Sequence, residues 1–150
     1  MNAPQSFAIT VVSPTRIDLS WTDPDFPTPP PDSIVIQRKA AGGSYATIDS
    51  DSAGTDSYSD TNCVQSVHYY YRAAYYRNGS AVSSWAMPKD GWTPPAPITG
   101  VTLTIDGLTA TLAWTNGGTY DYVHYIGSWG GTGTAIAGSL TTITDRKSVV

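Results

Sequence analysis

The sequence contains no glutamate, and charged side chains of either sign are scarce. All twelve acidic residues are aspartate, eight lysines and arginines leave a net charge of −4, and only 13% of the 150 residues are charged. Binding to nucleic acid requires a basic face that neutralises phosphates, so we expect no nucleic-acid partner. No apolar run approaches the roughly 20 residues that span a bilayer, so we expect no membrane insertion.

Cysteine and histidine are also nearly absent. Cys63 has no second cysteine with which to form an intrachain disulfide, and we interpret it as a small apolar residue that fills space in a loop. His68 and His124 are the only histidines, and no zinc-binding spacing joins them to a pair of cysteines. These residues therefore predict no metal centre.

The remaining reactive side chains do not form a catalytic pattern. Paired carboxylates occur at Asp23 and Asp25 and again at Asp49 and Asp51, and such pairs can hold calcium. Aspartate is also common in turns, because its side chain bonds local backbone groups, and we favour that interpretation. A Gly-x-Ser-x-Gly nucleophile motif is missing. We predict no catalytic residue, no metal and no cofactor, and therefore a protein that is not an enzyme.

Serine, threonine and turn-forming residues are abundant instead. Fourteen glycines and eleven prolines are spread along the chain. This composition argues against a helical bundle and favours many short strands joined by turns. Ile17, Leu19 and Trp21 alternate with polar residues, which is typical of a strand with one buried face.

This alternating pattern occurs twice. Residues 4–22 align without a gap with residues 97–115, at an offset of 93 residues (97 − 4). A repeat of this length is the size of a domain, so we predict two domains, residues 1–94 and residues 95–150. The corresponding apolar positions, predicted to lie in the two cores, are Leu19, Trp21, Leu112 and Trp114.

The first repeat contains further strand signals. The sequence Asn78-Gly79 is the strongest short signal for a hairpin turn. Together with two strands within residues 4–22, the further segments make the seven strands of a small β-sandwich. These segments are residues 33–39, 45–49, 56–60, 67–77 and 81–86.

Several short motifs of the first repeat resemble the fibronectin type III family. They are Ile17-x-Leu19-x-Trp21, Tyr58-Ser59-Asp60-Thr61, Tyr69-Tyr70-Tyr71-Arg72-Ala73 and the Asn78-Gly79 hairpin, in the order that the family shows. The resemblance implies an all-β chain of tandem antiparallel β-sandwiches of the immunoglobulin-like type. It also implies that Trp21, Tyr69 and Tyr71 are core residues. By that match the Tyr69 hydroxyl bonds the backbone a few residues upstream, as a tyrosine corner does.

The second repeat resembles the family only in part. It supplies five expected strands, after which the sequence stops, so that the last two strands of the sandwich are lacking. One interpretation is a fragment of a longer tandem array. The other is that a partner supplies the missing strands by β-augmentation, including a homo-oligomer with strand complementation. The expected strands are residues 101–105, 108–115, 120–126, 134–137 and 140–144.

Aromatic residues are the remaining candidates for binding. Alternation along residues 67–77 places Tyr70, Arg72 and Tyr76 on the outer face of their strand, with Trp85 of the next strand against Arg72. Trp129 lies in a glycine-rich loop and has little core to enter. Another tryptophan, at position 92, is expected to pack at the joint between the domains. Exposed tryptophan and tyrosine anchor protein interfaces or stack on sugar rings.

Two functional hypotheses follow from these features. The first is a structural or adhesive module of an extracellular or virion surface assembly, such as a phage head or tail fibre, with other protein subunits as its partners. The alternative is a spacer or carbohydrate-binding accessory domain of a secreted bacterial carbohydrate-active enzyme, with a glycan as its ligand. The fold alone does not distinguish them.

Overall fold

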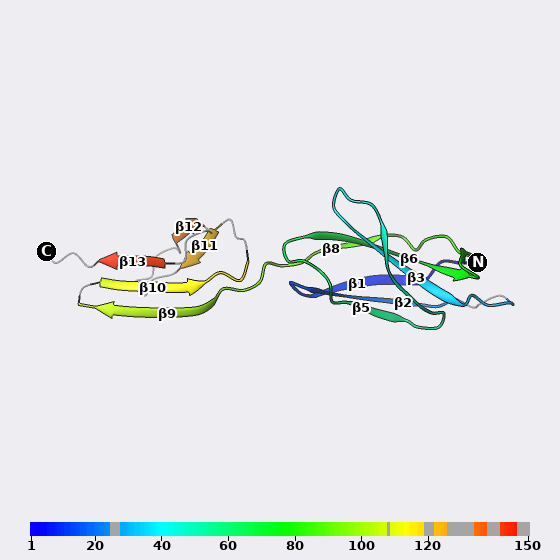
Figure 1. The fold of residues 1–150 in the computed structure, drawn as a ribbon, viewed down its shortest axis with the longest axis horizontal. Helices are drawn as coiled ribbons and strands as arrows, with labels where there is room; N and C mark the ends of the chain where they lie inside the picture. Colours follow the sequence, from blue (N-terminus) through cyan, green and yellow to red (C-terminus); the bar gives the residue numbers. More distant parts are fainter. Residues whose placement is uncertain (25–27, 108, 119–121, 126–133, 138–141, 147–150) are drawn as a thin grey trace. The chain divides into compact units, whose positions relative to one another are not determined.

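The computed structural model describes residues 1–24, 28–107, 109–118, 122–125, 134–137 and 142–146, and the structural statements below concern these residues. Their regular elements are the strands β1 to β13 (Figure 1). The chain divides into two compact units, Met1–Pro94 and Pro95–Val150. Within the described residues there is no helix of the length and apolarity needed to cross a membrane.

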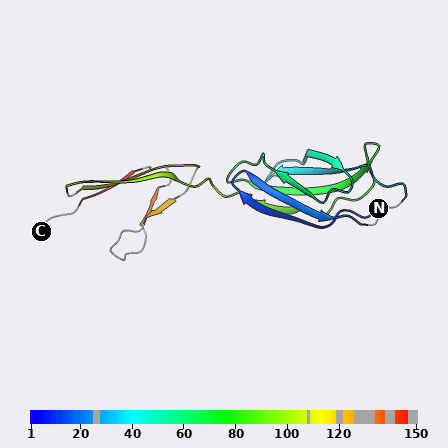
Figure 2. The same ribbon diagram turned by 90° about the horizontal axis from the view of Figure 1, so that it is seen from below.

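The first unit consists of two antiparallel sheets that lie one over the other (Figures 1 and 2). One sheet has the order β1-β2-β5, and its strands are Gln5–Ser13, Arg16–Thr22 and Ser57–Asp60. In the other sheet β4 pairs with β3, β3 with β6, and β6 with both β7 and β8. The strands β3, β4, β6, β7 and β8 are Ser33–Ala40, Ala46–Ser52, His68–Arg77, Ser80–Ala81 and Lys89–Trp92.

The core lies between the two sheets and follows the alternation of the strands. In β2 the side chains of Ile17, Leu19 and Trp21 are at most 3% exposed, and the residues between them are half-buried or exposed. The opposite sheet contributes alternate residues of β3 and β6 to the same cluster, namely Ile34, Ile36, Tyr69, Tyr71, Ala73 and Tyr75. Burial of each large apolar side chain contributes about 1.5–3 kcal/mol relative to exposure, so this cluster is the main source of stability.

The hairpin between β6 and β7 has the expected turn. Asn78 and Gly79 both have positive φ, at 50° and 74°, which is the conformation that matches the twist of a two-residue hairpin. The strand expected over residues 81–86 was wrong, because β7 ends at Ala81 and pairing with β6 resumes only at β8. The intervening segment still bonds β6, because the Val82 amide donates to the Tyr75 carbonyl at 2.9 Å and the Ala86 amide donates to the Ala73 carbonyl at 2.8 Å.

The second unit contains a sheet of order β13-β10-β9 and the separate pair β11-β12. A strand overlaps every segment expected in this repeat. The strands are β9 (Thr99–Asp106), β10 (Thr109–Thr115), β11 (Tyr122–Tyr125), β12 (Thr134–Ala137) and β13 (Thr142–Arg146).

Only one of the two predicted core residues of this unit is buried. Trp114 is 6% exposed, whereas Leu112 is half-buried, so the prediction for Leu112 was wrong. Its cross-strand partner Leu103 of β9 is 63% exposed. This part of the sheet face is therefore open to solvent.

Candidate functional site

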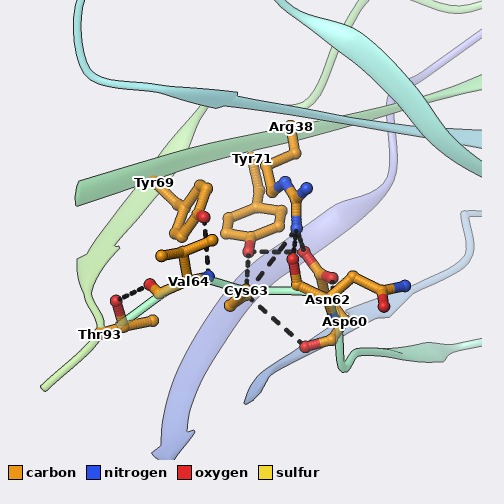
Figure 3. A network of polar contacts seen from close by, with 8 residues as sticks. All are labelled: Arg38, Asp60, Asn62, Cys63, Val64, Tyr69, Tyr71 and Thr93. Atoms are coloured by element: carbon orange, nitrogen blue, oxygen red, sulfur yellow. Dashed lines mark hydrogen bonds and ion pairs between the residues drawn. The ribbon is translucent and has the colours of Figure 1, made fainter. Parts of the chain in front are cut away.

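The side chains of strand β6 point alternately into the core and away from it. Its inward tyrosines contact the loop that connects β5 to β6. Tyr69 is 5% exposed, and its hydroxyl accepts a hydrogen bond from the Val64 amide at 2.9 Å (Figure 3). The structure thus places a hydroxyl-to-backbone bond five residues upstream of the tyrosine. The Arg38 guanidinium lies over the Tyr69 ring at 4.8 Å from its centroid.

The carboxylate of Asp60 is the centre of the polar contacts in Figure 3. Asp60 is 1% exposed, and its Oδ2 accepts hydrogen bonds from Arg38 Nη1 at 2.7 Å and from the Tyr71 hydroxyl at 2.9 Å. Its Oδ1 accepts from the Asn62 amide at 3.1 Å. Arg38 and Tyr71 are paired across β3 and β6, so the register of the two strands brings both donors to one carboxylate. A buried charge is tolerated only when it is paired and hydrogen-bonded in this way.

Cys63 is part of the same network and is not a reactive thiol. It is 5% exposed, and its Sγ lies 3.3 Å from the Tyr71 hydroxyl. Burial raises the pKa of the Cys63 thiol. Burial also raises the pKa of the Tyr71 phenol, and its hydrogen bonds with Cys63 and Asp60 raise this pKa further. Both groups therefore stay neutral at neutral pH, which is the opposite of what a nucleophile needs.

The outward residues of β6 form a stack of rings and cations. The Arg72 guanidinium lies between the rings of Tyr45 and Trp85, at 4.0 Å and 4.2 Å from their centroids. Gln37 Oε1 accepts from Arg72 Nη2 at 2.7 Å and from Arg72 Nε at 2.9 Å. Lys39 Nζ lies over Tyr45 at 5.0 Å. Each contact between a cation and a ring contributes about 0.5–2 kcal/mol, depending on how far it is desolvated.

The stack continues toward both ends of β6. At one end Trp85 also contacts Tyr76, with ring centroids 6.3 Å apart. At the other end Lys39 Nζ lies 5.1 Å from the centroid of Tyr70. We call this half-buried patch the outer aromatic face. Its members are Lys39, Tyr45, Tyr70, Arg72, Tyr76 and Trp85.

A histidine and a tryptophan extend the outer aromatic face along β8. The rings of His68 and Trp92 are stacked, with centroids 4.6 Å apart and an interplanar angle of 16°. His68 Nε2 lies 2.7 Å from Asp90 Oδ2, and the His68 ring is 4.5 Å from that of Tyr70. Trp92, expected at the joint between the domains, is 64% exposed and has its ring contact with His68.

The structure brings together four of the five residues that the sequence offered for binding. Tyr70, Arg72, Tyr76 and Trp85 share the outer aromatic face, whereas Trp129 lies outside the described residues. None of the four is fully exposed. Trp85 contacts Arg72 and Tyr76, which flank Ala74 on the same side of β6, and Ala74 is 0% exposed.

Sequence reasoning missed several members of this face. Tyr45 and Lys39 were not expected there, and neither was the contact of His68 with Asp90. Alternation gives the side of each residue on its own strand, but which residues meet depends on the pairing of β3 with β6 and of β6 with β8. In the described ranges no group of three or more His, Cys, Asp or Glu side chains is placed to hold a metal ion.

Comparison with known proteins bears on the fold. No protein-family model and no curated protein matches the sequence. A two-domain fibronectin type III segment from chicken tenascin is similar in structure, with a TM-score of 0.73 and 19% identity, covering 99% of this chain and 85% of that one. The fn3 domain of human contactin 1 has a TM-score of 0.57 and 15% identity, covering 65% of this chain and 81% of that one.

A third structure agrees with these two. The FN1–FN3 domains of chicken CNTN1 have a TM-score of 0.54 and 12% identity, covering 97% of this chain and 55% of that one. Identities this low establish the fold and leave the function open. The chain has the all-β, immunoglobulin-like sandwich fold of fibronectin type III domains, which confirms the fold class implied by the motifs of the first repeat.

Removal of the Asp60 charge tests the buried network. We expect Asp60→Asn to lower the free energy of unfolding by about 3 kcal/mol, because the charge of Arg38 loses its partner in a largely buried site. The matched control is Asp18→Asn, which breaks the Arg16–Asp18 pair, whose side chains are 45% and 34% exposed. The control should cost at most about 1 kcal/mol. Urea unfolding of the full chain measures both, and equal losses would contradict a special role for Asp60.

The reactivity of Cys63 tests its burial. Reaction with a thiol reagent at pH 8 should be on the order of 100-fold slower in the native chain than in urea, because reaction requires opening of the core. In urea the rate should level off above the ordinary thiol pKa of about 8.5. In the native chain it should still rise at pH 9–10, because burial raises the thiol pKa. Superimposable pH profiles in the two states would show that Cys63 is exposed.

Proposed function

We propose that this chain is a non-catalytic β-sandwich module that binds other proteins through the outer aromatic face. The observation that carries the proposal is the position of Arg72 between Tyr45 and Trp85. Tryptophan, tyrosine and arginine are the residues that most often dominate the binding energy of protein interfaces. Here they form one patch on a sheet face that is half-buried and still accessible to solvent.

The geometry of this patch favours binding because its side chains are already ordered. Gln37 and the two rings fix the Arg72 guanidinium. Long side chains normally lose about 0.5–1.5 kcal/mol each when an interface immobilises them. Side chains that are already ordered in the folded chain lose less conformational entropy when a partner binds. The same contacts exclude water from the stems of the side chains, which strengthens the polar contacts that a partner makes.

We propose an extracellular or virion surface assembly, such as a phage head or tail fibre, as the setting of this module. The support is the sandwich fold, which many cell-surface domains share, together with the division of the chain into two compact units. Other protein subunits of that assembly are the proposed partners.

A second candidate function rests on Trp92. Its ring is 64% exposed and is supported by His68, which in turn is bonded to Asp90. A supported, exposed indole is a surface on which a sugar ring stacks. This observation favours a carbohydrate-binding accessory domain of a secreted bacterial carbohydrate-active enzyme as the alternative. The polar groups beside the indole already bond each other, which leaves fewer of them to orient a sugar.

Site-specific photo-cross-linking tests the proposal without replacing a member of the outer aromatic face. A photoreactive amino acid replaces Thr47, an exposed β4 residue whose hydroxyl accepts from Gln37 beside Arg72. The matched control replaces Ser20, an exposed residue of β2 on the other sheet. The full chain is irradiated in the cells that produce it or in the particles that contain it. We expect a discrete protein adduct from position 47 and none from position 20.

Three outcomes would count against the proposal. Adducts of equal yield from both positions indicate random collisions, and no adduct from position 47 indicates a face without a protein partner. Quenching of tryptophan fluorescence by saccharides, abolished by Trp92→Ala and retained in Trp85→Ala, would instead favour the carbohydrate-binding alternative.

A further inference from the structure

Within the part of the chain that the structure describes, strand β9 of the second unit is paired along one side only. In the sheet order β13-β10-β9 it is the terminal strand, and among the described residues it pairs only with β10. All residues from Thr99 to Asp106 are exposed. The backbone groups that point away from β10 are therefore open to solvent, and a row of such groups is a template on which another strand can add.

The side chains of β9 make this edge suited to a strand. Val101, Leu103 and Ile105 are 56%, 63% and 70% exposed and alternate with glycine and threonine. They share the sheet face of Trp114, because Leu103 is paired with Leu112, two residues away from Trp114 on β10. The strand has no proline and no lysine, and its one charge, Asp106, is its last residue.

The other long edge strands carry the features that usually prevent edge pairing. The pairing of β1 shows register shifts at two places, near each of its ends. Strand β4 carries Asp49 and Asp51, and its pairing with β3 has a register shift that leaves Ile48 without an opposite residue. By contrast, the pairing of β9 with β10 is shifted near the start of β9, between Thr99 and Thr102, and is regular from Thr102 to Asp106. The regular segment Thr102–Asp106 therefore contains no proline and no bulge, and its one charged residue is Asp106 at its end.

We propose that β9 pairs antiparallel with β9 of a second copy of this chain, about a two-fold axis at Thr104. The regular segment has Thr104 at its centre, so pairing this segment with itself places Thr104 opposite Thr104 of the second copy. Leu103 then lies opposite Ile105 in both halves, and Thr102 lies opposite Asp106. Apolar meets apolar, threonine meets threonine and the two aspartates stay apart, which are the favourable cross-strand pairs.

A second copy fits this edge better than an unrelated strand. The strand that the edge needs alternates apolar residues and threonine over five residues, and β9 is itself such a strand. Two-fold pairing of one patch with itself is also the commonest way in which identical chains associate. The product is a continuous sheet of order β13-β10-β9-β9-β10-β13. This inference concerns the second unit alone and does not depend on the outer aromatic face.

Sedimentation velocity of the full chain tests whether it associates. The wild type should shift from monomer to dimer as its concentration rises. Leu103→Lys should raise the dissociation constant at least 10-fold, because it places a charge on the paired edge. Leu103 is 63% exposed, so this change leaves the fold intact. A wild type that is monomeric at all concentrations up to the millimolar range, or a variant with unchanged association, would overturn the proposal.

Disulfide trapping tests the register. Opposite residues of an antiparallel pair have Cα atoms about 4.5–5.5 Å apart, within the range that a disulfide spans. Thr104→Cys should therefore form a covalent dimer on mild oxidation. In the matched control Thr102→Cys the two thiols lie four residues apart along the pair, about 13 Å, and should not link. Equal linking of the two variants, or linking of the control alone, would contradict pairing about Thr104. Cys63 is 5% exposed in the wild-type chain, so we expect it not to compete in either variant.

Discussion

The alternation of side chains along β6 is the constraint on which the first unit depends. This strand is paired on both sides, with β3 along most of its length and with β7 and β8 at its ends. Its position in the sheet is therefore fixed by backbone hydrogen bonds. Every second residue enters the core, and the residues between them form the outer aromatic face. A slip of one residue would exchange the two sets, placing Arg72 in the core and Tyr71 in solvent.

Each face of β6 has its own means of holding that register. On the inner face the Asp60 carboxylate accepts from both Tyr71 and Arg38, so this hydrogen-bond pattern requires β3 and β6 to be aligned as they are. On the outer face Arg72 is bonded to Gln37, its direct partner on β3. The polar contacts thus specify one alignment, while burial of the apolar residues supplies most of the stabilisation. The proposed binding face is ordered by the same alignment that closes the core.

The sequence was sufficient for the fold class and for the side of each residue on β6, because both follow from local period and turn chemistry. It failed where the outcome depends on pairing between distant segments. Trp85 was expected in a strand and lies outside one, although its contact with Arg72 was anticipated. The stacking of His68 on Trp92 requires knowledge that β8 pairs with β6, which no local pattern reveals. Leu112 fits the alternation, yet it is half-buried, and its partner Leu103 on β9 is exposed.

Amide hydrogen exchange along β6 tests the central claim most directly. The amides of Tyr70, Arg72 and Ala74 face β3, because the carbonyls of His68 and Tyr76 on the same side of β6 accept from Ala41 and Asp32 at the two ends of β3. Alignment with β3 predicts that these three amides are among the slowest of the chain and exchange together, through global unfolding of the first unit. The amides on the open edge of β9 should exchange much faster under conditions that keep the chain monomeric. Fast exchange at the three β6 amides, or exchange with unrelated rates, would contradict a single strand that orders both the core and the outer aromatic face.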